Sequence, residues 1–600
     1  MLPYGIIGNC KTCALIRKDS SIDWMCYPDF SSPSVFAKLL DENKGGTLKI
    51  NPIGKYKITQ KYIPNTAILE TTFENKNNLF QTIDFFPRYR KLTKNKYKKL
   101  VRQNRLIRII KLIKGNPKIK VIYEPKPDYA LKTHKLVEID NNLLSSGTDF
   151  SLVSNIPYQK IIQQETIELN QTKYIIVGQK DLAEDFNVKR CMVLFHSTKK
   201  YWENWCSSLI LPKKNKEIII RSAITLKLLT YSPTGAIIAA PTTSIPEELN
   251  SERTWDYRFC WVRDSVFCVD ALKKIGRSYE AKKLLNFLIN KVLTEKNIQI
   301  MYGIKGETKL EEEILGHLSG FKNTKPVRIG NAAFNQTQHD IFGEIIDLMY
   351  LYFVYYQYEK PKNKHWHLLK YCIKQIKLNW RQVDSGIWEF RGLKKHYTFS
   401  KFMCCLGVES AVKIADFFKR PELVQKWNKI KEEIFSDLIK KGYNQEIKAF
   451  TMYYGSNSLD ASLLLMAYHE FLNKDDKRLI STIKKIDKNL RHNDLVQRYN
   501  IHDDFGMPRS AFTICSFWLI DALYYIGEKE KAHNLFNKLI KKSNHLGLFS
   551  EDIDLKTKSL IGNFPQSYTH IALINSAILL SEWGAKRKKI DWNSKGLKLK

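Results

Sequence analysis

The segment Arg253-Thr-Trp-Asp-Tyr-Arg-Phe-Cys-Trp-Val-Arg-Asp264 leads directly into an apolar run that starts at Ser265 and has helical spacing. It places three guanidinium groups and two carboxylates among aromatic rings. Such rings stack on the C–H-rich faces of sugars, and paired Arg and Asp side chains form forked hydrogen bonds to neighbouring hydroxyls. A structural ladder of stacked Trp and Arg side chains at a domain boundary would have the same sequence pattern. The segment alone therefore does not decide between a sugar-binding and a structural role.

Helical periodicity dominates the chain after residue 217. We predict helices near 219–231, 264–275, 278–292, 338–357, 364–380, 400–418, 421–440, 458–472, 475–489, 510–526, 528–542 and 566–582. The connections between them are unequal and rich in Trp, Tyr, Arg, Asp, Glu and Gly. A solenoid would repeat a short turn at a constant period, and no such period is present. We therefore expect a closed helical toroid that carries a site on its connections.

The N-terminal part has the pattern of strands. Short apolar runs with alternation and β-branching are separated by Gly, Pro, Asn and Asp clusters at hairpin spacing. Because helices do not intervene, the pattern predicts an antiparallel β-sandwich. The expected strand segments are 46–62, 67–73, 79–86, 105–113, 117–125, 173–180 and 191–197.

The charge balance is strongly basic, with 97 Lys and Arg against 61 Asp and Glu in 600 residues, a net charge of +36. The surplus recurs from end to end, with its densest clusters at 88–99 and 586–600, so we expect a solvated surface and no nucleic-acid site. Aromatic residues make up 12%, which excludes global disorder. The most apolar stretch, 218–240, is interrupted by charges, Pro and Gly, and the N-terminus has no signal-peptide pattern. We expect a cytoplasmic protein without a membrane partner.

Eleven cysteines are scattered along the chain, which is not the pattern of a disulfide framework. Cys10, Cys13 and Cys26 would supply three zinc ligands, but no second pair completes a tetrahedral set nearby. Free thiols in a reducing compartment are the preferred interpretation. We expect neither a metal nor a cofactor.

Two further connections carry carboxylates suited to catalysis. In the segment 384–392, Glu389 follows Trp388, and a carboxyl desolvated by an indole has the raised pKa that a general acid needs. The alternative is an ion pair between Glu389 and Arg391. The segment 547–554 holds Glu551 with two aspartates, without an EF-hand pattern. A closed ring would bring Glu389 and Glu551 together, and such a pair hydrolyses glycosidic bonds.

Over nearly its whole length the chain resembles glycoside hydrolase family 15, the family of glucoamylases and trehalases. The N-terminal motifs resemble the trehalase-like region of that family. The motifs that carry the resemblance are Ile7-Gly-Asn9, Ser21-Ile-Asp-Trp-Met-Cys26, Ser32-Pro-Ser-Val-Phe-Ala37, Trp255-Asp-Tyr-Arg258, Trp261-Val-Arg-Asp264, Met301-Tyr-Gly-Ile-Lys-Gly-Glu307, His317-Leu-Ser-Gly320, Pro326-Val-Arg-Ile-Gly-Asn-Ala-Ala333, Gly386-Ile-Trp-Glu389, Tyr454-Gly-Ser456, Leu459-Asp-Ala-Ser462 and Gly562-Asn-Phe-Pro-Gln566.

The resemblance implies an N-terminal antiparallel β-sandwich (1–215), a helical linker (216–250), an (α/α)6 barrel (251–590) and a basic tail (591–600). It also implies inverting cleavage of α-glucosidic bonds. Carried over by motif, Glu389 is the general acid and Glu551 the general base. Substrate contacts are expected from Trp261, Arg263, Asp264, Trp388 and Arg391, with Gln566 and Tyr568 as weaker pocket candidates. His545 and His570 are expected to be structural, and the segment 503–510 receives no role.

The substrate is a carbohydrate on this interpretation, and its identity stays open. Our first expectation is glucoamylase-like release of glucose from glycogen, starch or maltooligosaccharides, and the alternative is α,α-trehalase. A phosphorolytic toroid would replace the base by a phosphate site, so the presence of Glu551 disfavours it. A non-catalytic glycan-binding protein is the alternative from another class. Assembly into a homo-oligomer is compatible with the sequence.

Overall fold

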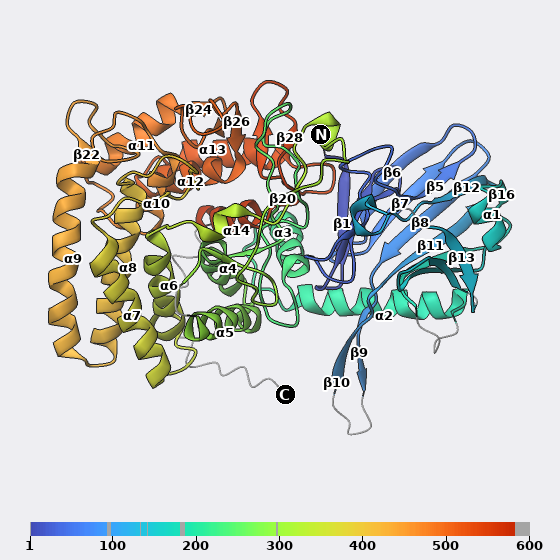
Figure 1. Cartoon of the computed structure of the whole chain (residues 1–600), viewed down its shortest axis with the longest axis horizontal. Helices are drawn as coiled ribbons and strands as arrows, with labels where there is room; N and C mark the ends of the chain where they lie inside the picture. Colours follow the sequence, from blue (N-terminus) through green and yellow to red (C-terminus); the bar gives the residue numbers. More distant parts are fainter. Residues whose placement is uncertain are drawn as a thin grey trace.

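A computed structural model describes residues 2–92, 98–132, 134–140, 142–180, 186–295 and 298–581. Figure 1 shows two parts side by side, a strand-rich part formed by the first third of the chain and a helical part formed by the rest. Within the described residues, no helix is both long and apolar enough to cross a membrane.

The strand-rich part consists of two antiparallel sheets. Phe36 and Phe150, one from each sheet, pack edge to face with ring centroids 5.8 Å apart. The first sheet contains β1 (Tyr4–Gly8), β2 (Cys13–Arg17), β3 (Ile22–Cys26), β4 (Ser34–Phe36), β5 (Leu48–Pro52), β12 (Lys118–Tyr123) and β16 (Ile167–Glu168). The second contains β6 (Lys57–Tyr62), β7 (Leu69–Glu74), β8 (Leu79–Phe85), β11 (Arg105–Lys114), β13 (Leu136–Ile139), β14 (Asn142–Ser145), β15 (Phe150–Ser154) and β17 (Lys173–Gln179). The predicted antiparallel sandwich is confirmed.

A buried ion pair joins the two sheets. Arg108 of β11 lies opposite Asp84 of β8, 2.6 Å from its carboxylate, and both side chains are 0% exposed. The same guanidinium donates to the backbone oxygens of Ser20 and Leu48, which belong to the first sheet and its turn. The pair is therefore fully hydrogen-bonded, the condition under which a buried charge is tolerated.

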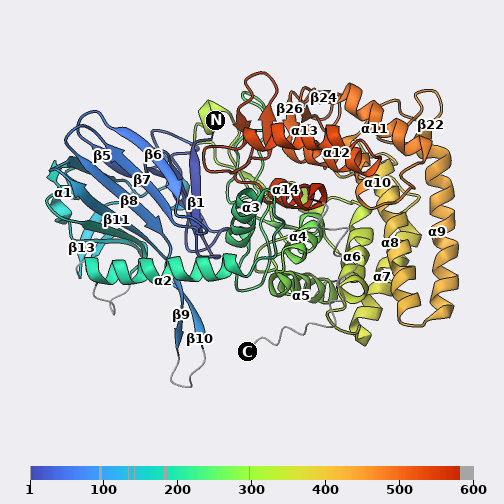
Figure 2. The ribbon, with the colours of Figure 1, turned by 180° about the vertical axis from the view of Figure 1, so that it is seen from behind.

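The strand prediction for 191–197 is wrong, because this segment lies in α2 (Val188–Ser207). The buried residues of α2 include Cys191, Leu194, Thr198, Trp202 and Trp205, which follow helical spacing over the whole helix. A short apolar run cannot reveal that period, and only the longer window does. The side chain of Asn187 accepts a hydrogen bond from the backbone of Arg190 and caps the helix. Figures 1 and 2 show α2 running along one edge of the sandwich toward the helical part.

Each of the twelve predicted helices has a counterpart in the described helical part. Six form an inner ring, since they are buried on nearly every side: α4 (Val262–Lys274), α6 (Asp340–Tyr350), α8 (Thr398–Phe417), α10 (Leu465–Tyr468), α12 (Thr513–Tyr525) and α14 (Ser567–Leu580). The others cover them: α3 (Lys216–Leu229), α5 (Ser278–Thr294), α7 (Asn363–Asn379), α9 (Pro421–Gly442), α11 (Lys477–Asn489) and α13 (Lys529–Leu539). Because α14 packs against α4, the ring closes.

Two inner helices touch through their backbones. A Cβ on Gly343 of α6 would lie 2.0 Å from the carbonyl oxygen of Met403 in α8, and one on Gly407 of α8 would lie 2.4 Å from the Cα of Gly343. Only glycine permits this approach.

The sandwich and the ring are joined by hydrogen bonds between buried groups. The side chain of Asn544, after α13, donates to the backbone oxygens of Leu2 and Tyr4 at 3.1 and 2.8 Å. The indole of Trp24 donates to the backbone oxygen of Pro241 at 2.7 Å. The bonds of Asn544 tie the N-terminal strand to the last third of the chain, and the bond of Trp24 ties β3 to the segment between α3 and α4.

The two basic clusters fall partly or wholly outside the described residues. The cluster 88–99 begins on a two-stranded hairpin, β9 (Arg88–Leu92) and β10 (Lys98–Arg102), that leaves the sandwich (Figure 1), and residues 93–97 are not described. Its first member, Arg88, is buried and donates to the backbone oxygen of Asn9. The tail 586–600 lies beyond the described residues. All eleven cysteines lie within the described residues and are buried, and none of them forms a disulfide.

Candidate active site

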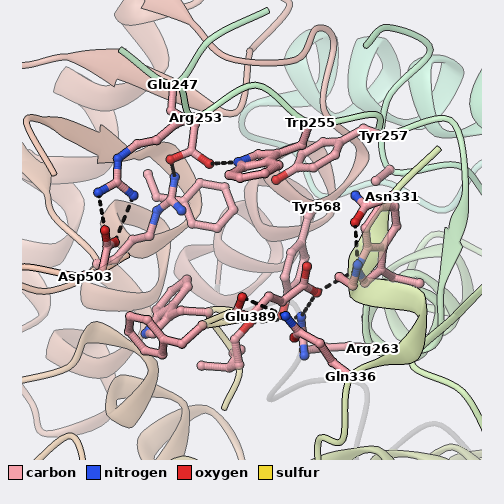
Figure 3. A pocket seen from close by; sticks show the side chains of 18 of the residues that line it. Glu247, Arg253, Trp255, Tyr257, Arg263, Asn331, Gln336, Glu389, Asp503 and Tyr568 are labelled. Carbon is pink, nitrogen blue, oxygen red and sulfur yellow. Dashed lines mark hydrogen bonds and ion pairs between the residues drawn. The ribbon is translucent and has the colours of Figure 1, made fainter. Parts of the chain in front are cut away.

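A pocket opens at the N-terminal ends of the inner helices (Figure 3). Trp261, Arg263 and Asp264 reach it from the start of α4, and Gln566 and Tyr568 from the start of α14. About 920 Å³ of space lies inside it, including the part open to solvent. Helix N-termini carry partial positive charge, so the arrangement favours negatively charged side chains at this end of the ring.

Glu389 lies in the wall of this pocket, in the connection between α7 and α8. Its carboxylate accepts a hydrogen bond from the indole of Trp261 at 2.8 Å and lies 3.4 Å from a guanidinium nitrogen of Arg263. Burial raises the pKa of Glu389, while Arg263 and the bond from Trp261 oppose the rise. The backbone of Glu389 has φ of 61°, a left-handed conformation that non-glycine residues adopt with strain. The carboxyl is thus held in one place and kept toward its protonated form.

The floor of the pocket is charged and buried. Arg263 pairs with Asp340 at 3.1 Å and donates to the side-chain oxygen of Gln338 at the same distance. Burial raises the pKa of Asp264 to about 7. Behind this floor, burial also raises the pKa of Glu344 well above its usual range, and the neighbouring Asp340 adds to the rise. A carboxyl whose pKa lies near 7 carries a proton part of the time at neutral pH, so it can both donate and accept hydrogen bonds. This property suits sugar hydroxyls.

Aromatic side chains form one wall. The ring of Trp388 lies 6.0 Å from that of Phe512 and 6.2 Å from that of Trp518. Its indole N–H donates to Asp460 at 3.0 Å, which fixes the ring plane. Flat apolar faces of this kind suit the C–H faces of a sugar.

Glu551 lies behind the opposite wall and is 0% exposed. Tyr257 lines the pocket and donates its hydroxyl to Oε1 of Glu551 at 2.5 Å, and the backbone N–H of Asn563 donates to Oε2 at 3.3 Å. Burial raises the pKa of Glu551 well above its usual value, and the neighbouring carboxylates Glu247 and Asp552 add to the rise. The hydroxyl of Tyr257 therefore connects Glu551 to the pocket.

Ion pairs form the rim. Arg253 binds both carboxylate oxygens of Asp503, at 2.9 and 2.6 Å. Arg391 pairs with Glu312 at 2.7 Å and lies over the ring of Trp255, 4.6 Å from its centroid. The expected alternative, a pair between Arg391 and Glu389, is therefore not formed.

Six of the seven residues expected to act on substrate line this one pocket: Trp261, Arg263, Asp264, Trp388, Glu389 and Arg391. The seventh, Glu551, is one hydrogen bond away from it. The weaker candidates Gln566 and Tyr568 also line the pocket. His570 is buried between the Ser222 hydroxyl and the Phe549 backbone N–H, and His545 bonds Gln60 of the sandwich. Both histidines make structural contacts.

Several lining residues were not singled out from the sequence. Asp503 and Asp504 belong to the segment 503–510, to which no role was given, and Asp504 accepts hydrogen bonds from the backbones of Arg391 and Gly392 at 2.6 and 3.1 Å. Glu247, which precedes Glu248, and Arg498 belong to none of the motifs quoted from the sequence. Tyr257 lies inside the segment 253–264. The recurrence of aromatic residues there, at Trp255, Tyr257 and Trp261, is the sequence feature that could have identified it.

Sequence comparison finds one family model in each part of the chain. The model of "Glycosyl hydrolases family 15" matches residues 213–578, and that of "Trehalase-like, N-terminal" matches residues 3–172. A trehalase of Mycolicibacterium smegmatis is 34% identical and covers 96% of this chain and 90% of its own length. A trehalase of Thermoplasma volcanium is 32% identical and covers 97% and 94%.

Structure comparison finds the crystal structure of a bacterial glucoamylase complexed with acarbose. It matches with a TM-score of 0.66 and 15% identity, and covers 96% of this chain and 93% of its own. The expected succession of a β-sandwich and an (α/α)6 toroid is thereby confirmed.

Proposed function

The chain belongs to glycosyl hydrolase family 15 and is a glycoside hydrolase, and from that premise we propose that it hydrolyses α,α-trehalose with Glu389 as general acid and Glu551 as general base. The observation that carries the proposal is the pair of carboxyls around one pocket, in different environments. Glu389 faces the pocket beside Trp261 and Arg263, and Glu551 is enclosed behind Tyr257.

We favour trehalose as the substrate over the glucoamylase-like substrates that were our first expectation. The relatives named trehalase are 32–34% identical and cover 96–97% of this chain. The glucoamylase structure, at 15% identity, supports the fold alone. Starch, glycogen and maltooligosaccharides therefore form the competing substrate class.

The shape of the pocket supports a terminal glucose at its floor. Exposure increases from Arg263 and Asp264, which are 6% and 7% exposed, through Glu389 to Arg391, whose side chain is 33% exposed. The Arg263 guanidinium and the Asp264 carboxyl suit the hydroxyls of the first glucose, with Trp388 against its ring. The second glucose then lies toward Arg391.

The reaction needs one proton donor and one acceptor. Protonated Glu389 gives its proton to the oxygen between the two sugars as the C1–O bond breaks, while a water oxygen attacks C1 from the opposite face. Because Tyr257 lines the pocket and donates to Glu551, the proton of that water has a hydrogen-bonded path to the base. Exchange with solvent then returns a proton to Glu389 and removes one from Glu551.

Substrate identity is tested by incubating the purified protein separately with trehalose, maltose, isomaltose and glycogen and measuring glucose. Trehalose is expected to be consumed fastest. Faster release from glycogen would assign the competing class, and no glucose from any of the four would favour the non-catalytic glycan-binding alternative.

The stereochemistry gives a second test. Inverting cleavage of α,α-trehalose yields one β-glucose from the attacked ring and one α-glucose from the leaving ring, whereas retention yields two α-glucose molecules. Early NMR spectra are expected to show the two anomers in equal amounts. Only α-glucose at early times would overturn the single-displacement mechanism.

A further inference from the structure

Three carboxylates and one arginine meet at the wall of the pocket that carries Tyr257, where Glu247 and Arg498 line the pocket and Glu551 and Asp552 lie behind it. Glu247, Glu551 and Asp552 each place a carboxylate oxygen within 4.8 Å of the other two, and their exposures are 3%, 0% and 0%. Arg498 lies 2.6 Å from Glu247 and 3.0 Å from Asp552. Fully ionised, the four groups would carry a net charge of −2 in a buried place, so their protonation states depend on one another.

Each of the six carboxylate oxygens already has a partner. Glu247 accepts from the indole of Trp255 at 2.9 Å and pairs with Arg498. Asp552 accepts from the hydroxyl of Ser510 at 2.8 Å and also pairs with Arg498. Both oxygens of Glu551 accept from neutral donors, a tyrosine hydroxyl and a backbone N–H. Glu551 is thus the member without a direct cationic partner among the described residues, and it depends on its neighbours for charge balance.

The charged neighbours come from separate parts of the chain. Glu247 lies in the segment between α3 and α4, and Arg498 lies in the connection after β25 (Leu495–Val496). Both line the pocket, and Figure 3 shows Glu247 on the same side as Arg253 and Asp503. The titratable groups that face Glu551 are these two with Tyr257 and Asp552, of which Arg498 alone favours its ionised form by charge.

We propose that Glu247 and Arg498 are positioning residues of opposite sign that act on Glu551 through their charges and set the pH at which it accepts a proton. The proposal rests on the assignment of Glu551 as the base in the function proposed above. Glu247 opposes the loss of the proton and Arg498 promotes it. Their ion pair keeps both effects in balance, so Glu551 is poised to exchange its proton.

The test is the acidic limb of the kcat profile against pH with trehalose, because the base must lose its proton for turnover. At 4.8 Å, the upper limit of the separation between the carboxylate oxygens of Glu247 and Glu551, a unit charge moves a neighbour's titration by about 2.5 pH units at an effective dielectric constant of about 20. Glu247→Gln is therefore expected to move the limb to lower pH by about 1 unit or more. Arg498→Gln is expected to move it upward, and Arg498→Lys, which keeps the charge, to leave it within about 0.5 unit.

A matched control removes a carboxylate from another arginine pair in the same pocket. Asp503 pairs with Arg253 at 2.6 Å and lies outside the group of three carboxylates. Asp503→Asn is expected to leave the acidic limb in place. An unmoved limb in Glu247→Gln together with an unmoved infrared midpoint of Glu551, or a shift of the limb of the same size in Asp503→Asn, would overturn the proposal. If Arg498→Gln does not fold, Glu247→Gln and Arg498→Lys still decide the outcome.

A second readout does not need a substrate. Infrared spectra of the free protein against pH follow the protonated carboxyl of Glu551, identified as the band that Glu551→Gln lacks. Its midpoint is expected to move in the directions given above, and an unmoved midpoint in Glu247→Gln refutes the charge effect. If the infrared midpoints move but the acidic limb of the kcat profile does not, Glu551 is not the base. Its electrostatic coupling to Glu247 and Arg498 would still hold.

Discussion

Replacing Trp261 by Phe should move the basic limb of the pH profile upward. The indole donates to Glu389 at 2.8 Å, and the bond favours the ionised carboxylate. A hydrogen bond to a charged group contributes about 1.5–3 kcal/mol, and 1.36 kcal/mol corresponds to about one pH unit. Arg263 and Gln338 still act on Glu389 after the substitution, so the lower end applies. Because the acid must be protonated, activity in Trp261→Phe should persist to a pH higher by about 1 unit.

The assay is kcat for trehalose across the neutral and alkaline range, with circular dichroism to confirm the fold. Trp388→Phe is the matched control, because Trp388 lines the same pocket but donates to Asp460. Its basic limb should stay in place even if its KM rises through lost sugar contacts. A limb that stays in place in Trp261→Phe, or moves to lower pH, would refute the assignment of Glu389 as the proton donor.

Four other substitutions have expected outcomes. Glu389→Gln and Glu551→Gln should each lower kcat by at least about 10²-fold, the contribution of one acid or base. Their melting temperatures, measured by calorimetry, should stay close to that of the wild type. Near-normal turnover in either variant rejects the role assigned to that residue. Arg108→Leu, which leaves Asp84 charged and unpaired in the sandwich, should lower the stability by about 3–5 kcal/mol, seen as a lower urea midpoint, and the double variant with Asp84→Leu should recover much of it. Gly343→Ala should destabilise the ring by about 1–3 kcal/mol through overpacking, measured as a lower melting temperature, and an unchanged value would show that the two helices can separate at no cost.

The fold was predictable where the periodicity extended over a whole element. The helices from α3 onward follow apolar spacing over many residues, and the N-terminal strands alternate over short runs. The segment 191–197 misled because its apolar residues form a run too short to display a period, and the tryptophans that complete the helical face come later, at Trp202 and Trp205.

The site was predictable in part for a related reason. Trp261, Arg263, Asp264, Trp388 and Glu389 stand in two compact segments rich in rings and charges, and the pocket contains all of them. Glu247 and Arg498 act only through a group assembled from distant parts of the chain. An isolated charge in a lysine-rich sequence carries no local signal, so only the closed ring shows which charges become neighbours.

The bonds from Asn544 to the first strand also govern the order in which the protein can mature. At ordinary rates of synthesis, residue 544 leaves the ribosome about half a minute to two minutes after residue 2. During that time the backbone oxygens of Leu2 and Tyr4 lack the hydrogen bonds that Asn544 donates. Tyr568, which completes the pocket, follows later still. The β-sandwich of the nascent chain therefore lacks these hydrogen bonds for most of translation. We expect chaperones that shield exposed strand edges to influence the yield of active enzyme more than its catalytic rate.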